Sequence, residues 1–266
     1  MTLRHGYTFV GYYVTLGLFG AGGLLLSTVA FLAGAAPADA GTERFFQRLI
    51  HRSCAGFVRW TRWTRLFYVH YHGLDALPQR AGGLVIVANH PGLTDITSLL
   101  ARLPEAVCIF KPAIRRNPVL GAAARRAGYL ASDGGHEVIR QAAAKVAAGH
   151  ALIIFPEGTR TPPGTAVLPF KPGFVLMARR GGVPIQLVRI SCSRPVLAKT
   201  RAWWKLPPLP ARADLTVGPC LRVESGADTA AVAAEIEAWF RAPPDAVAGY
   251  AWSRALRSTT LVSPAA

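Results

Sequence analysis

The sequence predicts an α/β domain, a mixed sheet flanked by helices, that follows a membrane-embedded helical pair at the N-terminus. Three observations support this fold class: an N-terminal stretch without charged side chains, short apolar runs that alternate with helical segments, and two apolar runs that end in polar turns. We expect an anchor over residues 1–66, an α/β domain over 67–225, and a C-terminal helix and tail over 226–266.

The chain is both apolar and strongly basic. Its 266 residues carry a net charge of +16, 51% of them are hydrophobic, and the mean hydropathy is +0.28. The charge indicates an anionic partner, and the apolar composition favours a membrane over nucleic acid, for which no sequence signature is present. The cysteines are too scattered for a disulfide framework and are expected to be reduced thiols in a cytoplasmic catalytic portion: Cys54, Cys108, Cys192 and Cys220.

Residues 6–38 contain no charged side chain. A helix over residues 9–32 is long enough to cross a bilayer core of roughly 30 Å. Ala38-Asp39-Ala40 imitates a signal-peptide cleavage site, but the apolar stretch is longer than that of an ordinary signal peptide, so a retained anchor is expected. A full span and a re-entrant helical hairpin in one leaflet are both consistent with this pattern.

A basic amphipathic helix is predicted over residues 43–66. Arg44, Arg48 and Arg52 recur at every fourth position, and aromatic and aliphatic residues occupy much of the other side. This pattern is typical of a helix in the headgroup layer, on the cytoplasmic side. The alternative is a helix packed on its own domain with its arginines in solvent.

The rest of the chain alternates between strand and helix patterns. The predicted strands are 67–71, 84–88, 107–110, 151–155, 184–190 and 214–217, and the predicted helices are 95–102, 118–127, 136–148, 174–180 and 229–240. We expect 199–212 to be a loop, either at headgroup depth or on the plain surface. A covering helix and a frayed end are expected over 243–266.

The most informative stretch is the turn after the apolar run 84–88. It carries His90, and Asp95 opens the next predicted helix. Pro91 and Gly92 bend the chain back, so the Asp95 carboxylate is expected to fix the tautomer of His90 and stabilise its imidazolium. No G-x-S-x-G turn or cysteine nucleophile accompanies the pair. The substrate is therefore expected to supply a hydroxyl, which His90 deprotonates as it attacks a thioester. Taken alone, a buried histidine capping a turn is the simpler interpretation.

A second apolar run, 151–155, also ends in a polar turn. This turn contains Glu157, Gly158, Thr159 and Arg160. Gly158 permits close approach of backbone N–H groups to a ligand, and the planar guanidinium of Arg160 suits phosphate. If both turns lie at one edge of the sheet, they form a single site.

Further along the chain, Lys171 precedes a predicted helix. A cation beside the N–H groups of a helix N-terminus is a suitable seat for phosphate. A solvated lysine in a proline turn is an equal alternative.

Together these motifs resemble the glycerolipid acyltransferases, most closely the 1-acylglycerol-3-phosphate (lysophosphatidic acid) acyltransferase type. The resemblance covers residues 84–188 and rests on Asn89-His90-x4-Asp95, Phe155-Pro156-Glu157-Gly158-Thr159-Arg160, Phe170-Lys171-x-Gly173 and Val183-Pro184-Ile185. It implies transfer of a fatty acyl group from acyl-CoA or acyl carrier protein to a lysophospholipid hydroxyl, giving phosphatidic acid when the acceptor is 1-acylglycerol-3-phosphate. It also implies a glycerolipid acyltransferase-like fold on a membrane-embedded helical pair.

The resemblance assigns roles to individual residues. His90 is the catalytic base and Asp95 orients it. The residues expected to bind substrate are Asn89, Glu157, Gly158, Thr159, Arg160 and Lys171, with the last two cations on the acceptor phosphate. No metal and no redox cofactor is needed, and the expected partners are the lipid substrate, the membrane and acyl carrier protein, not nucleic acid.

One segment departs from the family pattern. The family commonly has G-x-x-F-I-x-R, whose arginine contacts phosphate, where this chain has Gly128-Tyr129-Leu130-Ala131-Ser132-Asp133. Arg115, Arg116, Arg125 and Arg126 are the candidate substitutes. The gap leaves another lysolipid, or a specialised lipid conjugate such as that of a polyene pigment, as alternative acceptors. A non-catalytic protein that binds anionic membranes or transports lipid is the rival from another class, followed by a nucleic-acid binder.

Overall fold

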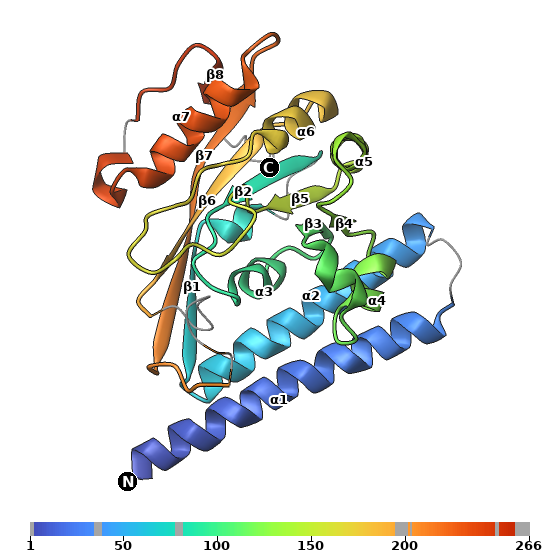
Figure 1. Ribbon diagram of the computed structural model, residues 1–266, viewed down its shortest axis with the longest axis vertical. Coiled ribbons are helices and arrows are strands. Elements are labelled where there is room, and N and C mark those ends of the chain that lie inside the picture. The colour runs from blue at the N-terminus through green and yellow to red at the C-terminus, as the bar shows by residue number, and fades with distance from the viewer. Residues whose placement is uncertain are drawn as a thin grey trace, which may run out of the picture.

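The computed structural model describes residues 3–34, 39–77, 82–194, 202, 204–247 and 250–258. It contains a single eight-stranded sheet covered by helices on both faces, with a helical pair, α1 (Leu3–Leu32) and α2 (Ala40–Trp63), along one side (Figure 1). The strands are β1 (Phe67–His72), β2 (Leu84–Ala88), β3 (Ala106–Phe110), β4 (Leu130–Ala131), β5 (Ala151–Ile154), β6 (Ile185–Cys192), β7 (Ala211–Val223) and β8 (Leu256–Ser258). The remaining helices are α3 (Asp95–Leu100), α4 (Gly121–Arg126), α5 (His136–Ala147), α6 (Gly173–Gly181) and α7 (Thr229–Arg241), with 3-10 turns η1 (Leu74–Ala76), η2 (Pro112–Arg116) and η3 (Pro244–Val247).

The sheet is mixed, as the sequence predicts. Its order is β1-β7-β6-β2-β5-β3-β4, and β8 pairs with β7. The strands from β6 to β4 run parallel to one another, whereas β7 is antiparallel to β6 and β8. The carboxyl ends of β2, β3, β4 and β5 therefore meet at one edge, where ligands bind in open α/β sheets.

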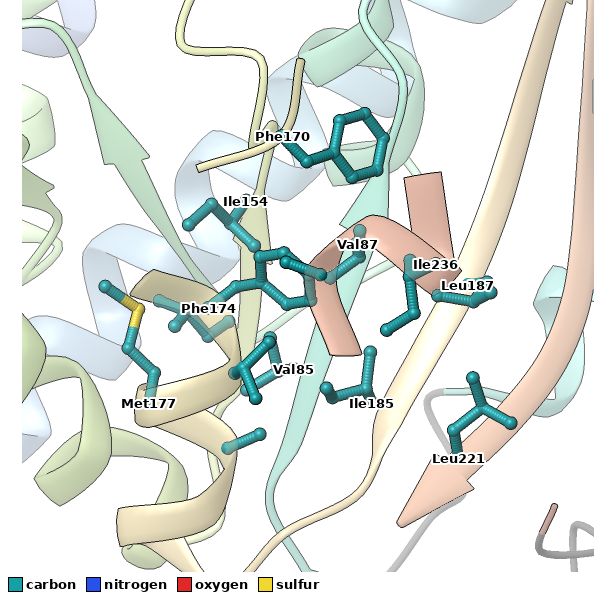
Figure 2. Close-up of a cluster of buried hydrophobic side chains, with 14 of the residues drawn as sticks. Val85, Val87, Ile154, Phe170, Phe174, Met177, Ile185, Leu187, Leu221 and Ile236 are labelled. Atoms are coloured by element: carbon teal, nitrogen blue, oxygen red, sulfur yellow. The ribbon is translucent and has the colours of Figure 1, made fainter. Parts of the chain in front are cut away.

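Both faces of the sheet are buried, which explains why the central strands are continuous apolar runs. Val85 and Val87 of β2 point into one core under α5, α6 and α7, together with Phe174 and Ile236 (Figure 2). Ile86 points to the other face, into the core that α3 covers. The strands that carry the polar turns are thus held rigidly from both sides.

Helix α1 lies against the globular part along most of its length. Tyr7 Oη donates to the Thr64 carbonyl at 2.8 Å, Trp60 Nε1 donates to Thr15 Oγ1 at 3.0 Å, and Ser27 Oγ donates to the Val119 carbonyl at 2.9 Å. From the first to the last of these contacts the helix advances by about 30 Å. Its other side is apolar and exposed, and of the described helices only α1, over His5–Leu32, is long and apolar enough to cross a membrane, a property shared by core helices and signal sequences.

Helix α2 packs on the domain and keeps its arginines outside. Ile50, Cys54 and Val58 contact the core beside α3. Arg44, Arg52 and the other predicted basic positions of this helix are exposed. The described arrangement is compatible with both predicted settings of this helix, the headgroup layer and the solvent-facing surface.

The C-terminal segment differs from the expectation. The sequence predicts a covering helix followed by a frayed end over 243–266, but the described part of this segment contains η3 and then β8, so the predicted helix is wrong there. Glu235 on α7 accepts hydrogen bonds from the backbone N–H and the hydroxyl of Ser253, both at 2.6 Å. This anchor lays the chain along β7, where β8 covers an edge that would otherwise be open. The alanine-rich composition gave no signal of this pairing.

The predicted loop over 199–212 lies partly outside the described residues. Its Trp204 is 55% exposed, and the Trp204 carbonyl accepts a hydrogen bond from Tyr13 Oη of α1 at 2.6 Å. Trp204 therefore lies beside the apolar helix, whereas residues 211–212, predicted to be loop, begin strand β7.

Candidate active site

The turn after β2 brings His90 and Asp95 together. His90 Nδ1 lies 2.9 Å from Asp95 Oδ2, and the Gly92 N–H donates to the same oxygen at 2.7 Å. Asp95 is the first residue of the short helix α3, and its carboxylate lies near the end of β2. The predicted contact is present, and the roles of the two side chains in catalysis stay predictions that rest on this geometry.

The imidazole is partly open to solvent, whereas the carboxylate is not. The His90 side chain is 17% exposed and that of Asp95 is 1% exposed. The ring stacks on Phe155, which follows β5, with centroids 4.2 Å apart and planes inclined by 19°. Within the described residues the hydrogen bond of the ring is made by Nδ1, which leaves Nε2 available to take a proton from a ligand.

Burial raises the pKa of Asp95, and the hydrogen bond and charge of His90 and the Gly92 N–H act in the opposite direction. Among the described residues, Asp95 Oδ1 is a buried oxygen with no hydrogen-bond partner. A buried carboxylate with only part of its hydrogen-bonding capacity satisfied costs stability when it is ionised. That cost is typical of a functional group, not of a structural one.

Glu157 ties the two polar turns to each other. Its Oε1 accepts from the His90 backbone N–H at 2.8 Å, and its Oε2 accepts from the Leu168 N–H at 2.8 Å and the Thr161 hydroxyl at 2.7 Å. Thr161 N–H in turn donates to the His90 carbonyl at 2.8 Å. Glu157 is 5% exposed, so its carboxylate positions His90. Direct contact with substrate, as the resemblance implies, stays a prediction.

Asn89 makes a comparable structural contact. Its Nδ2 donates to the Ile190 carbonyl at 2.8 Å, and its Oδ1 accepts from the Ile190 N–H at 2.7 Å. The side chain thus continues the pairing of β2 with β6 beyond the last strand residue. This support fixes the exit of the chain toward His90, and the predicted substrate contact of Asn89 remains untested.

Cations gather at the turn after β5. Gly158 has φ 66°, a left-handed conformation that favours glycine, and Lys171 Nζ lies 3.4 Å from the position a Cβ would take there. Lys111 Nζ donates to Thr159 Oγ1 at 3.3 Å. Arg160 is half-buried in the same turn. The structure thus brings all the predicted residues of this turn together.

Lys111 is a candidate that the sequence analysis missed. It follows β3, which lies parallel to β5, so the two strands end at the same edge. The available signal was a lysine directly after an apolar run, the same pattern that singled out His90.

The structure also brings one arginine to the segment that departs from the family pattern. Arg115 Nη2 lies 3.3 Å from Asp133 Oδ1, just beyond β4. Of the other candidates, Arg125 donates to the Arg115 carbonyl and Arg126 to that of Ala33. Arg115 is therefore the candidate nearest the position of the missing arginine.

Comparisons with known proteins find similarity to acyltransferases. Residues 68–191 match the model of the family described as Acyltransferase. The chain is 34% identical over 111 residues to a 1-acyl-sn-glycerol-3-phosphate acyltransferase of Helicobacter pylori, covering 40% of this chain and 47% of that protein. It is 37% identical over 112 residues to a lyso-ornithine lipid O-acyltransferase of Pseudomonas aeruginosa, covering 41% of this chain and 43% of that protein. The matches span less than half the length of these curated relatives.

A solved structure shares the fold. The 1-acyl-sn-glycerophosphate (LPA) acyltransferase PlsC of Thermotoga maritima superposes with a TM-score of 0.64, covering 88% of this chain and 94% of that chain at 22% identity. The family match spans the strands and turns that carry His90, Asp95 and Glu157. The part of the chain that carries the site, residues 68–191, thus matches the acyltransferase family.

Proposed function

We propose that this protein transfers a fatty acyl group from a thioester donor, acyl-CoA or acyl carrier protein, to the hydroxyl of a lysophospholipid. The observation that carries the proposal is the hydrogen bond between His90 and the buried Asp95 carboxylate at the ligand-binding edge of the sheet. His90 Nε2 takes the hydroxyl proton as the oxygen attacks the thioester carbonyl. The C–S bond then breaks, and the thiolate leaves as thiol with the proton from the imidazolium.

The cations at the strand ends indicate an anionic acceptor. Lys111, Arg160 and Lys171 surround the turn next to the dyad, which suits 1-acylglycerol-3-phosphate and would give phosphatidic acid. A second acceptor, a lyso-ornithine lipid, is favoured by one relative with that activity in its name and by the lack of the family arginine near Ser132 and Asp133. Arg115, paired with Asp133, is the substitute cation under the first alternative.

The same proposal places the protein on one leaflet of the membrane, at its cytoplasmic face. Helix α1 is fastened to the globular part by side chains near both of its ends, which favours a helix lying along the surface over one that spans the bilayer. Its outer side exposes large apolar residues, including Leu25 at 66% and Phe31 at 76%. Exposed apolar area of this kind suits the acyl region, and the arginines of α2 suit the headgroups.

The direct test measures thiol release from acyl-CoA or acyl carrier protein by the purified, detergent-solubilised protein with a panel of lysolipids. Mass spectrometry of the products identifies the acceptor. His90→Ala is expected to abolish transfer while the fold is retained, whereas His136→Ala, on an exposed histidine of α5, should leave it unchanged. Near-normal transfer by the His90 variant would refute the mechanism, and absence of thiol release with every acceptor would favour a non-catalytic lipid-binding protein.

A further inference from the structure

A cavity of about 290 Å³ lies between the C-terminal part of α1, the turn η2 and α4. Thr28 and Phe31 form its α1 side, and Arg115, Arg116 and Arg125 form the opposite side. In Figure 1 the C-terminal half of α1 passes beside α4. Neither His90 nor Asp95 lines it.

The cavity has an excess of positive charge. Its lining contains three arginines and no acidic residue. Arg115 pairs with Asp133 outside the lining, and Arg125 Nη1 donates to the Arg115 carbonyl at 2.6 Å. Among the described residues, the Arg116 side chain has neither a hydrogen bond nor an ion pair, so its guanidinium is available to a ligand. Guanidinium groups bind phosphate through two parallel hydrogen bonds, and a cluster of three favours a phosphate-bearing ligand.

The α1 side of the cavity is continuous with exposed apolar surface. Phe31 is 76% exposed although it lines the cavity, and Leu24 and Leu25 are 50% and 66% exposed. Leu24, Thr28 and Phe31 lie on one face of α1, because positions four and seven residues apart align along a helix. A ligand that fills the cavity and extends from it therefore has an anionic head and a hydrocarbon tail.

Apart from Arg115, which pairs with Asp133 and is the substitute cation of the proposed acceptor site, the cavity lies away from the turns that carry the dyad. Lys111, which contacts Thr159, directly precedes η2, and Arg116 ends this 3-10 turn. At about 2 Å per residue, the two side chains leave the backbone roughly 10 Å apart. The cations next to the dyad form one seat for an anion, and Arg116 and Arg125 of the cavity form a second.

We propose that this cavity binds the headgroup of an anionic membrane phospholipid, whose acyl chains lie along the exposed face of α1. A free phosphate ion would leave the apolar face of α1 uncovered, so a phospholipid fits the site better. The bound lipid would join α1 to η2 and hold the helix at a fixed depth. The proposal does not depend on acyl transfer.

The test is native mass spectrometry of the full chain in detergent with phosphatidylglycerol or phosphatidylcholine. The wild type is expected to retain one phosphatidylglycerol in preference to phosphatidylcholine. Arg116→Gln with Arg125→Gln should weaken this retention about tenfold or more, since hydrogen bonds to charged groups are the strong ones. The matched control is Arg52→Gln with Arg59→Gln, which removes the same charge from the exposed side of α2 and should keep the lipid.

A second variant guards against misfolding of the double arginine variant. Thr28→Trp fills the cavity from an exposed position of α1 without changing the charge, and it should also lose the lipid. Equal retention by the cavity variants and the wild type, or equal retention of the two lipids, would overturn the proposal. Complete displacement by millimolar inorganic phosphate would assign the site to a free anion instead. His90→Ala should retain the lipid, which separates this result from failure of the catalytic proposal.

Discussion

The strongest prediction concerns Glu157→Gln. In the wild type, the two carboxylate oxygens accept hydrogen bonds from the backbone N–H groups of His90 and Leu168 and from the Thr161 hydroxyl. A glutamine has one acceptor oxygen and one NH2 group, so one of the two backbone donors must face another donor. A flip of the amide decides only whether the N–H of His90 or that of Leu168 loses its acceptor, so neither orientation satisfies both donors.

The size of the effect follows from the burial of this carboxylate. A hydrogen bond to a charged group contributes about 1.5–3 kcal/mol, and a buried N–H without a partner adds to the loss, so we expect a destabilisation of about 2–4 kcal/mol. For a domain of this size that corresponds to a fall in Tm of roughly 5–10 °C. Acyl transfer should fall as well, because the released N–H belongs to His90 itself.

The assay is thermal unfolding in detergent, followed by thiol release at a temperature where both proteins are folded. The matched control is Glu137→Gln, which changes an exposed carboxylate paired with Arg140 and should leave the Tm nearly unchanged. A Glu157 variant with the Tm and the transfer rate of the wild type would refute the reasoning, since Glu157 would then contribute neither to the fold nor to the position of His90.

Three further predictions concern the same edge of the sheet. Asp95→Asn should lower transfer by about 10²–10⁴-fold. Burial raises the pKa of Asp95, so the stabilisation that this group provides when protonated is lost as the pH rises through that pKa. Unfolding measured across pH should therefore show the variant gaining stability over the wild type toward neutral pH. Gly158→Ala should lower the free energy of unfolding by about 1–2 kcal/mol because of its left-handed backbone, and it should raise the KM for an anionic acceptor by displacing Lys171. Gly164→Ala, also at positive φ but with open space around it, should leave the KM unchanged. An unchanged KM in the Gly158 variant would contradict the role of Lys171. Burial raises the pKa of Cys192 to about 12 and that of Cys108 further, so neither thiol should react with iodoacetamide at neutral pH before denaturation. Mass spectrometry detects the labelling, and rapid labelling of the native protein would contradict the absence of a thiol nucleophile.

The parts of the site that are local in sequence could be predicted, and the parts that depend on strand register could not. The contact of His90 with Asp95 requires only a short turn and a helix start, both visible as Pro91, Gly92 and the following pattern. The bond from Glu157 to the His90 backbone depends on the pairing of Val87 with Ile154, which sets the two turns at one level. That register is a tertiary property without a signal in either strand alone.

Strand β7 shows the same limit in the fold. The sequence predicts a strand over 214–217, ending before Gly218 and Pro219, which ordinarily interrupt strands. In the structure the register shifts near Gln186, whose Nε2 donates to the Gly218 carbonyl at 2.7 Å, and β7 continues to Val223. A buried glutamine on a neighbouring strand thus satisfies a group that the interruption would leave unpaired.

The contacts of α1 have a consequence for how this protein can be handled. Tyr7, Thr15 and Ser27 join the helix to groups that belong to the globular part, including the indole of Trp60. Deleting the helix to gain solubility would uncover those groups together with the Leu66 side chain that packs on Gly11. The shortened chain would lose the exposed apolar side of α1 but expose the apolar surface that α1 covers. Detergent should therefore be needed during purification whether or not the helix is kept.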